Sequence, residues 1–447
     1  MSFELYEYKI EDLGKVITGK TPPSKISDAF SAQGIPFVTP KDMDGRRLID
    51  KTERYLSSQG VEAVRNCLLP QNSIAVSCIG SDMGKTVLLP GESITNQQIN
   101  AIVVDSEHFD YKYVYYYLST LQDDFKAIAG GSATPILNKG HFSQFKVSLP
   151  VKPVQNKIAL ILDSLDTKIE VNTKINHTLE QMAQALFKSW FVDFEPVKAK
   201  MAVLESGGSQ ADAMLAAMTA ISGKDADALA VFEREHPEQY AELKATAELF
   251  PSAMQDSELG NIPVTWELGK LQDLLVLQRG FDLPSSARKD GEFPLIAASG
   301  PNGTHNVAMA KAPGVITGRS GVLGKVYLTL EDYWPLNTTL WVKEFKRATP
   351  CYAYELLRLL DMKAFNAGSA VPSLNRNHIH SLSYPLPPMA LVNLFESSAL
   401  LLHQRAHVNL KHSQSLALLR DTLLPKLLSG EITLPEAELA VSEAENV

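Results

Sequence analysis

The sequence predicts an α+β fold in which two similar domains are separated by two long antiparallel helices. The main observation is a gap-free internal repeat: residues 131–150 (GSATPILNKGHFSQFKVSLP) recur as residues 368–387 (GSAVPSLNRNHIHSLSYPLP), with nine of twenty positions identical. Short β-rich runs precede each copy, and a long amphipathic stretch follows it. A duplicated chain of this kind tends to have an internal two-fold axis, so we expect a pseudo-two-fold repeat.

The runs before the two copies occur in the same order. Each is short, apolar and bounded by Pro, Gly or Asn, as is typical of strands, and each series ends in a helical pattern. The strand-like runs are residues 35–39, 73–79, 86–89 and 99–104 in the first half, and residues 294–298, 314–317, 326–330 and 338–342 in the second. The sequence therefore predicts two equivalent domains at residues 1–150 and 259–388.

Apolar residues in heptad spacing follow each domain and predict spacer helices within residues 151–195 and 389–432. The first helix, from about residue 154 to 191, would span roughly 57 Å at ~1.5 Å per residue. Asn172 and Asn409 occupy the same heptad position, where a polar side chain fixes register, and Ser413 and Arg420 weaken the second seam. The predicted seam residues are Ile158, Leu162, Leu165, Ile169, Asn172, Leu179, Leu186, Phe395, Leu402, Asn409, Leu416 and Leu423.

Two further segments complete the predicted organisation. Residues 196–258 read as an acidic helical insertion, since residues 195–260 hold twelve acidic and five basic side chains. Pro425 should end or kink the second helix. The last segment, residues 433–447, is expected to be disordered because it is acidic and has few large apolar residues.

Composition excludes several classes of protein. No stretch approaches 18 consecutive apolar residues and the N-terminus has no secretory pattern, so we expect a cytoplasmic chain with no membrane contact. Cys67, Cys78 and Cys351 lack the spacing of a metal site and are expected to be buried thiols. We expect no metal site.

No motif predicts catalysis. The run from Gly80 to Thr86 has only three residues between its glycines, where a phosphate-binding loop needs four, so a hairpin turn is the better interpretation. His141 and His378 recur in the repeat, and packing against the following strand is favoured over a role as a catalytic base. The tyrosine-rich run 111–117 could stack on bases, but its helical spacing favours core packing.

Polar and basic residues lie in the predicted loops between strands. A two-fold molecule suits a two-part duplex site, Arg reads guanine, and Asn or Gln reads adenine, so these loops are candidates for DNA contact. For any one residue, a solvated loop is an equally good explanation. Lys139 and Arg376 are candidate phosphate contacts, and Asn138 and Asn375 could cap the adjacent turns. The loop candidates are Lys20, Thr21, Thr39, Lys41, Asp42, Arg46, Arg47, Ser77, Ser81, Lys85, Asn96 and Gln97 in the first domain, and Gln278, Arg279, Ser299, Asn302, Thr304, Arg319, Ser320, Asn337 and Thr338 in the second.

Nearly the whole chain resembles the DNA-specificity subunits of type I restriction–modification systems. The similarity is carried by the following segments: LGK at 13–15, IPFVTPKD at 35–42, NQQINAI at 96–102, GSATP at 131–135, the helix from Gln155 through Asn172, FKSWF at 187–191, SELGNIP at 257–263 with Trp266, QRGFDLP at 278–284 and LLPKLLSGEI at 423–432. The acidic insertion departs from the family pattern, because it is longer than the usual link at this point.

The resemblance implies two target-recognition domains, each reading one half of a split, asymmetric site in double-stranded DNA. It also implies a non-catalytic subunit that holds two modification (methyltransferase) subunits and can be joined by restriction subunits. S-adenosylmethionine, ATP and Mg²⁺ would belong to those partners, and this chain would bind no cofactor. Two alternatives remain open: a single-chain nuclease or methyltransferase, which the missing motifs disfavour, and an adaptor that bridges proteins without reading DNA.

Overall fold

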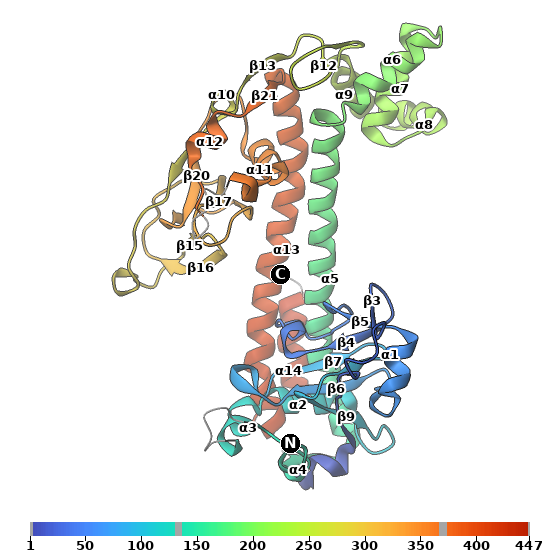
Figure 1. The fold of residues 1–447 in the computed structure, drawn as a ribbon, viewed down its shortest axis with the longest axis vertical. Coiled ribbons are helices and arrows are strands. Elements are labelled where there is room, and N and C mark those ends of the chain that lie inside the picture. The colour runs from blue at the N-terminus through green and yellow to red at the C-terminus, as the bar shows by residue number, and fades with distance from the viewer. Residues whose placement is uncertain (1–2, 130–135, 366–372, 446–447) are drawn as a thin grey trace. The chain divides into compact units, whose positions relative to one another are not determined.

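The computed structural model describes residues 3–129, 136–365 and 373–445 (Figure 1). The chain divides into two compact units, which we call unit 1 (Met1–Val171 with Lys411–Val447) and unit 2 (Asn172–Leu410). Both divisions fall inside long helices, α5 (Lys152–Phe191) and α13 (Met389–Ser429). Each unit therefore contains one copy of the repeated domain and one segment of each long helix.

Unit 1 is built on an antiparallel four-stranded sheet in the order β2-β9-β6-β7. A smaller sheet, β3-β5-β4-β8, contains a parallel pair, β4 with β8. Strand β1 pairs with β10 and closes the domain. The strands are β1 Tyr6–Lys9, β2 Gly14–Thr18, β3 Phe30–Ser31, β4 Ile35–Val38, β5 Tyr55–Leu56, β6 Ser73–Ser77, β7 Thr86–Leu89, β8 Ile94–Thr95, β9 Ile99–Val104 and β10 Lys146–Leu149, and the domain's helices are α1 Ser58–Ala63, α2 Tyr111–Ser119, α3 Gln122–Ile128 and α4 Lys139–Gln144.

Unit 2 repeats this topology. Its main sheet has the order β14-β20-β17-β18, its smaller sheet is β16-β15-β19 with β15 and β19 parallel, and β13 pairs with β21. The internal repeat is therefore confirmed as a repeat of fold. The strands are β11 Met254–Gln255, β12 Ile262–Pro263, β13 Glu267–Lys270, β14 Leu275–Arg279, β15 Phe293–Ala297, β16 Gly300–His305, β17 Gly314–Gly318, β18 Val326–Thr329, β19 Trp334–Pro335, β20 Thr339–Phe345 and β21 Ser383–Leu386, and the domain's helices are α10 Leu271–Leu274, α11 Pro350–Leu359 and α12 Arg376–His380.

The described part of the repeated element has the same local structure in both copies. The Asn138 side chain caps α4 by accepting a hydrogen bond from the His141 amide, and Asn375 caps α12 by accepting one from the Asn377 amide. Both capping predictions are confirmed. Residues 131–135 and 368–372, which carry the Gly-Ser-Ala and Pro part of the repeat, lie outside the described residues.

The tyrosine-rich run packs into the core of unit 1. Tyr113, Tyr115 and Tyr116 are buried, as the helical spacing predicts. This part of the chain forms two helices, α2 and α3, separated by Thr120 and Leu121. The run from Gly80 to Thr86 joins the antiparallel strands β6 and β7, so it is a hairpin turn as predicted. All three cysteines are buried and none forms a disulfide.

The two long helices pack through the predicted seam residues. In unit 1, one apolar core contains Leu162, Leu165, Leu416 and Leu423, and it also includes buried side chains of the β2-β9-β6-β7 sheet and of α2. In unit 2, Phe395 is fully buried in a core with Phe187 and Trp190. The helix faces that the heptads select are therefore apolar faces that also support each domain.

Arg420, which we expected to weaken the seam, forms an ion pair inside unit 1. Its Nη1 lies 2.5 Å from Oδ1 of Asp166 on α5, and Asp166 is buried. The other oxygen of Asp166 accepts a hydrogen bond of 2.6 Å from the Tyr116 hydroxyl on α2. One buried carboxylate thus connects both long helices to the domain.

In unit 2, asparagines link the helices in antiparallel order. Nδ2 of Asn176 donates to the Ala406 carbonyl at 2.9 Å, and Nδ2 of Asn409 donates to Oδ1 of Asn176 at the same distance. Nδ2 of Asn172 donates to the Asn409 carbonyl at 3.5 Å. These bonds satisfy polar groups in an apolar seam, which is how such residues select one register.

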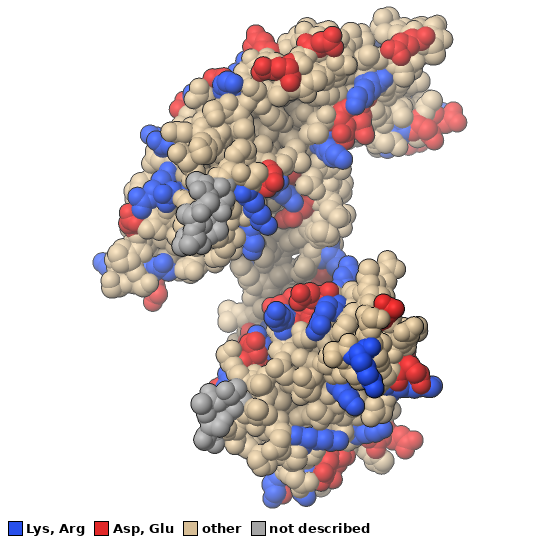
Figure 2. Space-filling model, viewed as in Figure 1, with Lys and Arg blue, Asp and Glu red and all other residues tan. Residues whose placement is uncertain are grey.

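The acidic insertion is helical, as predicted, with helices α6 Glu195–Glu205, α7 Gln210–Ser222, α8 Ala226–Glu235 and α9 Pro237–Glu248. It has a small core of its own around Met218 and Leu229. Nζ of Lys200 ties α6 to the end of α9 by donating to the carbonyls of Ala247 and Phe250. Figure 2 shows acidic side chains over these helices.

One prediction about the C-terminal region is wrong. Residues 433–447 were expected to be disordered, but α14 spans Leu434–Glu445 and buries Ala437 and Val441 in the core of unit 1. These two small side chains lie four residues apart on one helix face, so a short apolar contact suffices to order an acidic segment. Pro425 does not end α13, which continues to Ser429; the helix stops at Gly430, which adopts a left-handed φ of 73°.

Among the described residues, no helix is long and apolar enough to cross a membrane.

Unit 2 contains a buried acid beside a buried histidine. Glu355 on α11 is 1 % exposed, and its Oε1 lies 4.0 Å from Nε2 of His403 on α13. Burial raises the pKa of Glu355 to about 7, opposed by the charge of Arg358. Burial also lowers the pKa of His403 to about 4, with the charge of Arg358 adding to the effect. Between these two values the groups meet as neutral partners rather than as an ion pair.

Replacing Asp166 with alanine removes the partner of Arg420 and Tyr116. Breaking a buried charged contact costs about 3–5 kcal/mol, and because the Arg420 side chain is 27 % exposed we expect a loss of about 2–3 kcal/mol. Urea unfolding followed by circular dichroism measures the loss. Asp421→Ala removes an exposed carboxylate from the same arginine and should cost less than about 1 kcal/mol. Equal losses for the two variants would contradict a structural role for Asp166.

Replacing Glu355 with glutamine should change how stability depends on pH. Because the folded pKa lies above the ordinary value of 4.5, this carboxyl stabilises the folded state below pH 4.5 and loses that contribution as the pH rises to 7. The stability of Glu355→Gln relative to the natural protein should therefore rise by about 2–3 kcal/mol between pH 5 and pH 8. Tryptophan fluorescence during urea unfolding reports on this unit, because all four tryptophans lie in it. A difference that is the same at both pH values would rule out this titration.

Candidate nucleic-acid interface

Each unit places the ends of its two sheets together at one close backbone crossing. In unit 1 the amides of Gly19 and Lys20 donate to the carbonyls of Ile99 and Thr95. In unit 2 the amides of Gly280 and Phe281 donate to the carbonyls of Thr339 and Pro335. A Cβ atom at Gly19 would lie 2.2 Å from the Asn96 carbonyl oxygen, and one at Gly280 would lie 2.2 Å from that of Leu336. Both crossings therefore require glycine.

A hollow opens beside this crossing in each unit, at the carboxyl ends of the parallel strand pair. The unit 1 hollow follows β4 and β8 and measures about 390 Å³; the unit 2 hollow follows β15 and β19 and measures about 300 Å³. Both linings contain Thr, Pro, Asp, Arg and Asn, but only the first adds Phe, Lys, Glu and Gln, and only the second adds Leu and Ala. The first is lined by Phe37, Thr39, Pro40, Lys41, Asp42, Glu53, Arg54, Asn96 and Gln98, and the second by Asp282, Leu283, Pro284, Arg288, Ala297, Asn302, Leu336, Asn337 and Thr338.

Most of the loop candidates in unit 1 lie near the ends of the strands. Oγ1 of Thr21 donates to Oε1 of Gln97 at 2.8 Å, which joins the turn after β2 to the turn before β9. Nζ of Lys85 lies 2.7 Å from Asp82, and Arg46 pairs with Asp44, so these two cations have local carboxylate partners. The exposed candidates are Lys20, Lys41, Arg46, Ser81 and Gln97; Thr21, Thr39 and Lys85 are half-buried.

Four candidates of unit 1 are turned inward. Asp42 accepts hydrogen bonds from Thr39 and from the Glu53 amide, so it holds a turn. Ser77 is fully buried, and Asn96 bonds to Gln98. The fourth is Arg47, whose guanidinium pairs with carboxylates of α5.

The Arg47 guanidinium holds the domain of unit 1 against α5. Its Nη1 lies 2.6 Å from Oδ1 of Asp163 and its Nη2 lies 2.9 Å from Oε1 of Glu170. Lys112 reaches the other oxygen of Asp163 at 2.5 Å. Burial opposes ionisation of Asp163, but hydrogen bonds from Arg47 and Lys112 outweigh it and lower the pKa of the carboxyl. With a side chain only 12 % exposed, Arg47 does not belong to a DNA-facing surface.

The loop candidates of unit 2 divide between two hollows. Asn302, Asn337 and Thr338 line the hollow after β15 and β19, and Oγ1 of Thr338 accepts a hydrogen bond from the Ala298 amide. Arg279 and Arg319 line a second hollow of about 430 Å³. Ser299 and Thr304 are exposed, and Gln278 and Ser320 are half-buried.

This second hollow, which we call the arginine hollow, is lined by Arg279, Arg319, Leu340, Phe365, Ser373, Leu374, Asn375, Arg376 and His378. Its arginines come from the end of β14, the turn after β17 and the start of α12. Burial, with the charges of Arg376 and Lys346, lowers the pKa of His380, which accepts a hydrogen bond from the Leu277 amide.

The repeated histidines do not pack against the following strands, so that prediction is wrong. His141 and His378 are both exposed, because the short helices α4 and α12 turn these positions outward. The lining residues Arg54 and Arg288 were missed. Arg54 stacks over the rings of Phe30 and Phe37, and Arg288 donates to Oδ1 of Asn302. Each contact joins separate loops, so no short motif marks it.

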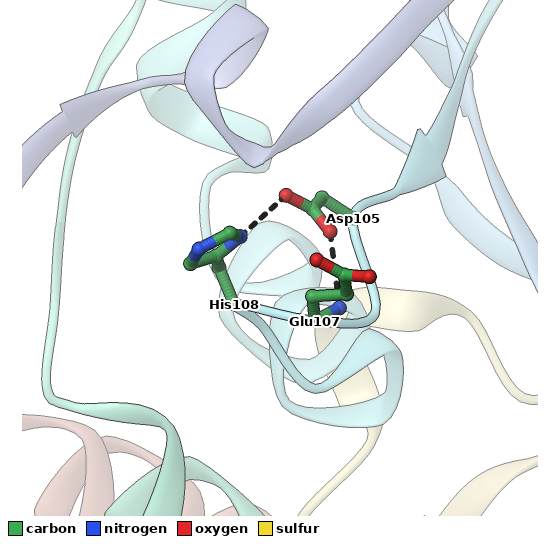
Figure 3. A group of neighbouring side chains, drawn as sticks. All are labelled: Asp105, Glu107 and His108. Atoms are coloured by element: carbon green, nitrogen blue, oxygen red, sulfur yellow. Dashed lines mark hydrogen bonds and ion pairs between the residues drawn. The ribbon is translucent and has the colours of Figure 1, made fainter.

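Asp105, Glu107 and His108 form the one group of potential metal ligands within the described residues (Figure 3). Nδ1 of His108 lies 2.7 Å from Oδ2 of Asp105, whose other oxygen accepts from the Glu107 amide. The hydrogen bond from His108 lowers the pKa of Asp105. All three side chains are exposed, and their contacts are those of the turn that precedes α2, so they give no reason to place a metal here.

This fold belongs to a known family. Residues 4–181 match the protein-family model described as "Type I restriction modification DNA specificity domain". The chain is 32 % identical over 323 residues to the Type I restriction enzyme HindI specificity subunit of Haemophilus influenzae, covering 65 % of this chain and 70 % of that one. It therefore belongs to the type I specificity subunits, the non-catalytic members of restriction–modification systems, which recognise DNA sequence and assemble with other subunits.

Two further comparisons extend over nearly the full length. The Type I restriction enzyme MjaIX specificity subunit of Methanocaldococcus jannaschii is 25 % identical over 441 residues, covering 96 % of this chain and 93 % of that one. The crystal structure of the type I restriction–modification S subunit from M. genitalium superposes with a TM-score of 0.52 at 16 % identity, covering 95 % of this chain and 96 % of that one. The latter supports the fold.

Gly19→Ala should destabilise unit 1, because the new methyl group would meet the backbone of Thr95 and Asn96. Forcing an atom into a packed site costs about 1–3 kcal/mol. Gly91→Ala is the matched control, since its Cβ would meet no atom within 4 Å and its stability should change by about 0.5 kcal/mol or less. Urea unfolding by circular dichroism compares the two. Equal stability would mean that the crossing tolerates a side chain.

Proposed function

We propose that this chain recognises a bipartite, asymmetric site in double-stranded DNA, with the domain of each unit reading one half. The observation that carries the proposal is the pair of equivalent hollows. Both lie at the carboxyl ends of a parallel strand pair beside a glycine crossing, yet their linings differ. Equal scaffolds with unequal side chains are what an asymmetric two-part site requires, because base-edge contacts specify the sequence.

We infer that the exposed candidates contact the DNA: Lys20, Lys41, Arg46, Ser81 and Gln97 in unit 1, and Arg279, Ser299, Asn302 and Thr304 in unit 2, with the half-buried Asn337 and Thr338 beside them. Lys139 and Arg376 are both exposed and fit phosphate contacts. The long helices act as the spacer that fixes the gap between the half-sites, since a helix of 40 residues is about 60 Å long.

The proposed partners are two modification subunits, joined in some complexes by restriction subunits. Those partners would methylate adenine. They would also bind the S-adenosylmethionine, ATP and Mg²⁺ that the assembled system uses. A methyltransferase must take the base out of the stack, so the partner rather than this chain would hold the extruded adenine. The setting we propose is the cytoplasm.

Mapping methylated adenines across host DNA tests the proposal. With the chain present we expect one split motif, and deletion of the chain should abolish methylation at that motif. Methylation that persists unchanged after deletion would sink the proposal and favour an adaptor or silent subunit.

Variants of single hollows sharpen this test. Gln97→Ala in unit 1 should relax methylation specificity in one half of the motif only, and Asn337→Ala in unit 2 should relax it in the other half only. Each true base contact should cost about 1–3 kcal/mol of discrimination. Arg234→Ala on α8 is a control that should leave both halves unchanged. Relaxation of the same half by both variants would contradict the assignment of one half-site to each unit.

A further inference from the structure

The arginine hollow of unit 2 concentrates positive charge on a small area. Arg279, Arg319 and Arg376 line it, and one carboxylate, Asp282, lies beside it and pairs with Arg279 at 3.2 Å. Nη1 of Arg319 donates to the Asn337 carbonyl at 3.5 Å, and Nη1 of Arg376 donates to the Leu277 carbonyl at 3.4 Å. These backbone contacts orient two of the three guanidinium groups at the rim of the hollow.

At the equivalent place in unit 1, the residues that match Arg279 and Arg319 have uncharged side chains. The registers match Thr18 with Arg279, because Thr18 lies opposite Asn100 and Arg279 lies opposite Leu340. Cys78 matches Arg319, because their carbonyls accept hydrogen bonds from the amides of the repeat residues Leu137 and Leu374.

In unit 1 these matched side chains both bond to the side chain of Asn100. Oγ1 of Thr18 donates to Oδ1 of Asn100 at 2.6 Å, and Nδ2 of Asn100 lies 3.1 Å from Sγ of Cys78. Of the three arginines that line the hollow in unit 2, only Arg376 has a basic counterpart in unit 1, which is Lys139. The two domains thus differ by two positive charges at one position of the fold.

We propose that the arginine hollow binds one backbone phosphate of the DNA half-site read by unit 2, and that unit 1 has no equivalent phosphate site. This inference rests on the proposed function. Three guanidinium groups from three segments suit a compact anion, because each presents a fork of donors that matches phosphate oxygens. A guanine edge offers two acceptors to one arginine and would leave the other positive charges unmatched.

The test uses the full chain assembled with its modification subunits and a duplex carrying the mapped site. Each phosphate of the unit 2 half-site is replaced in turn by an uncharged methylphosphonate. For the natural protein, one replacement should weaken binding by about tenfold more than its neighbours. For Arg319→Gln that replacement should have little further effect, because the phosphate and the arginine act through the same contact.

Salt dependence gives a second measurement. Each lost phosphate contact should reduce the slope of log affinity against log salt by about 1, equally for specific and unrelated duplexes. We expect this for Arg319→Gln and Arg376→Gln. Arg234→Ala, which removes one positive charge from α8, is the matched control and should keep the natural slope. Thermal unfolding of each variant checks that the fold is intact.

The outcomes separate the two proposals. If Arg319→Gln keeps the natural salt slope but tolerates a change at one base pair, the arginine reads a base and the phosphate inference fails, while the proposed function stands. If folded Arg319→Gln and Arg376→Gln bind like Arg234→Ala, the hollow does not contact DNA. If the natural complex prefers no bipartite duplex at all, the proposed function itself fails.

Discussion

The buried polar contacts between α5 and α13 are the constraint on which both domains depend. An apolar helix seam alone tolerates slippage by one heptad, because Leu and Ile side chains are nearly interchangeable. Slippage is prevented by two polar pairs. These are Asp166 with Arg420 in unit 1, and Asn176 with Asn409 in unit 2. A shift would leave a carboxylate, a guanidinium or an amide unpaired in an apolar environment, which costs more than any single apolar contact returns.

In unit 1 the same contacts also orient the domain. The carboxylate of Asp166 that holds Arg420 also accepts from Tyr116 on α2, and Asp163, one turn earlier on α5, holds Arg47 and Lys112. The β2-β9-β6-β7 sheet therefore packs on α5 in one orientation. Nonpolar packing supplies the stability, while these charged contacts select among packings of similar energy. Such selection matters for a domain whose loops must meet base edges at hydrogen-bond distance.

Much of this architecture is predictable from the sequence, because it rests on local periodicity. The strand runs, the heptad seam and the caps at Asn138 and Asn375 follow from patterns within a few residues, and the repeat of topology follows from the direct comparison of residues 131–150 with 368–387. The hollows were only partly predictable. Arg47 and Arg279 were both predicted to lie in loops between strands, yet the first pairs with carboxylates of α5 and the second lines a hollow. Arg47 takes its role from Asp163 and Glu170, which lie more than a hundred residues away, and sequence periodicity carries no such information. The order of α14 depends likewise on the distant core that receives Ala437 and Val441.

The overall charge of −9 poses an apparent difficulty for a DNA reader, and the distribution of charge within unit 2 resolves it. Much of the deficit belongs to the segment that contains α6–α9, which Figure 1 shows well apart from the β14-β20-β17-β18 sheet of the same unit. Charges separated by more than a Debye length, about 10 Å at 0.1 M salt, are largely screened from each other. The acidic helices contribute no lining residue to the arginine hollow, whose field acts on any anion that enters it. Net charge governs the approach of the whole molecule to DNA, but a phosphate at the recognition surface responds to the three guanidinium groups beside it.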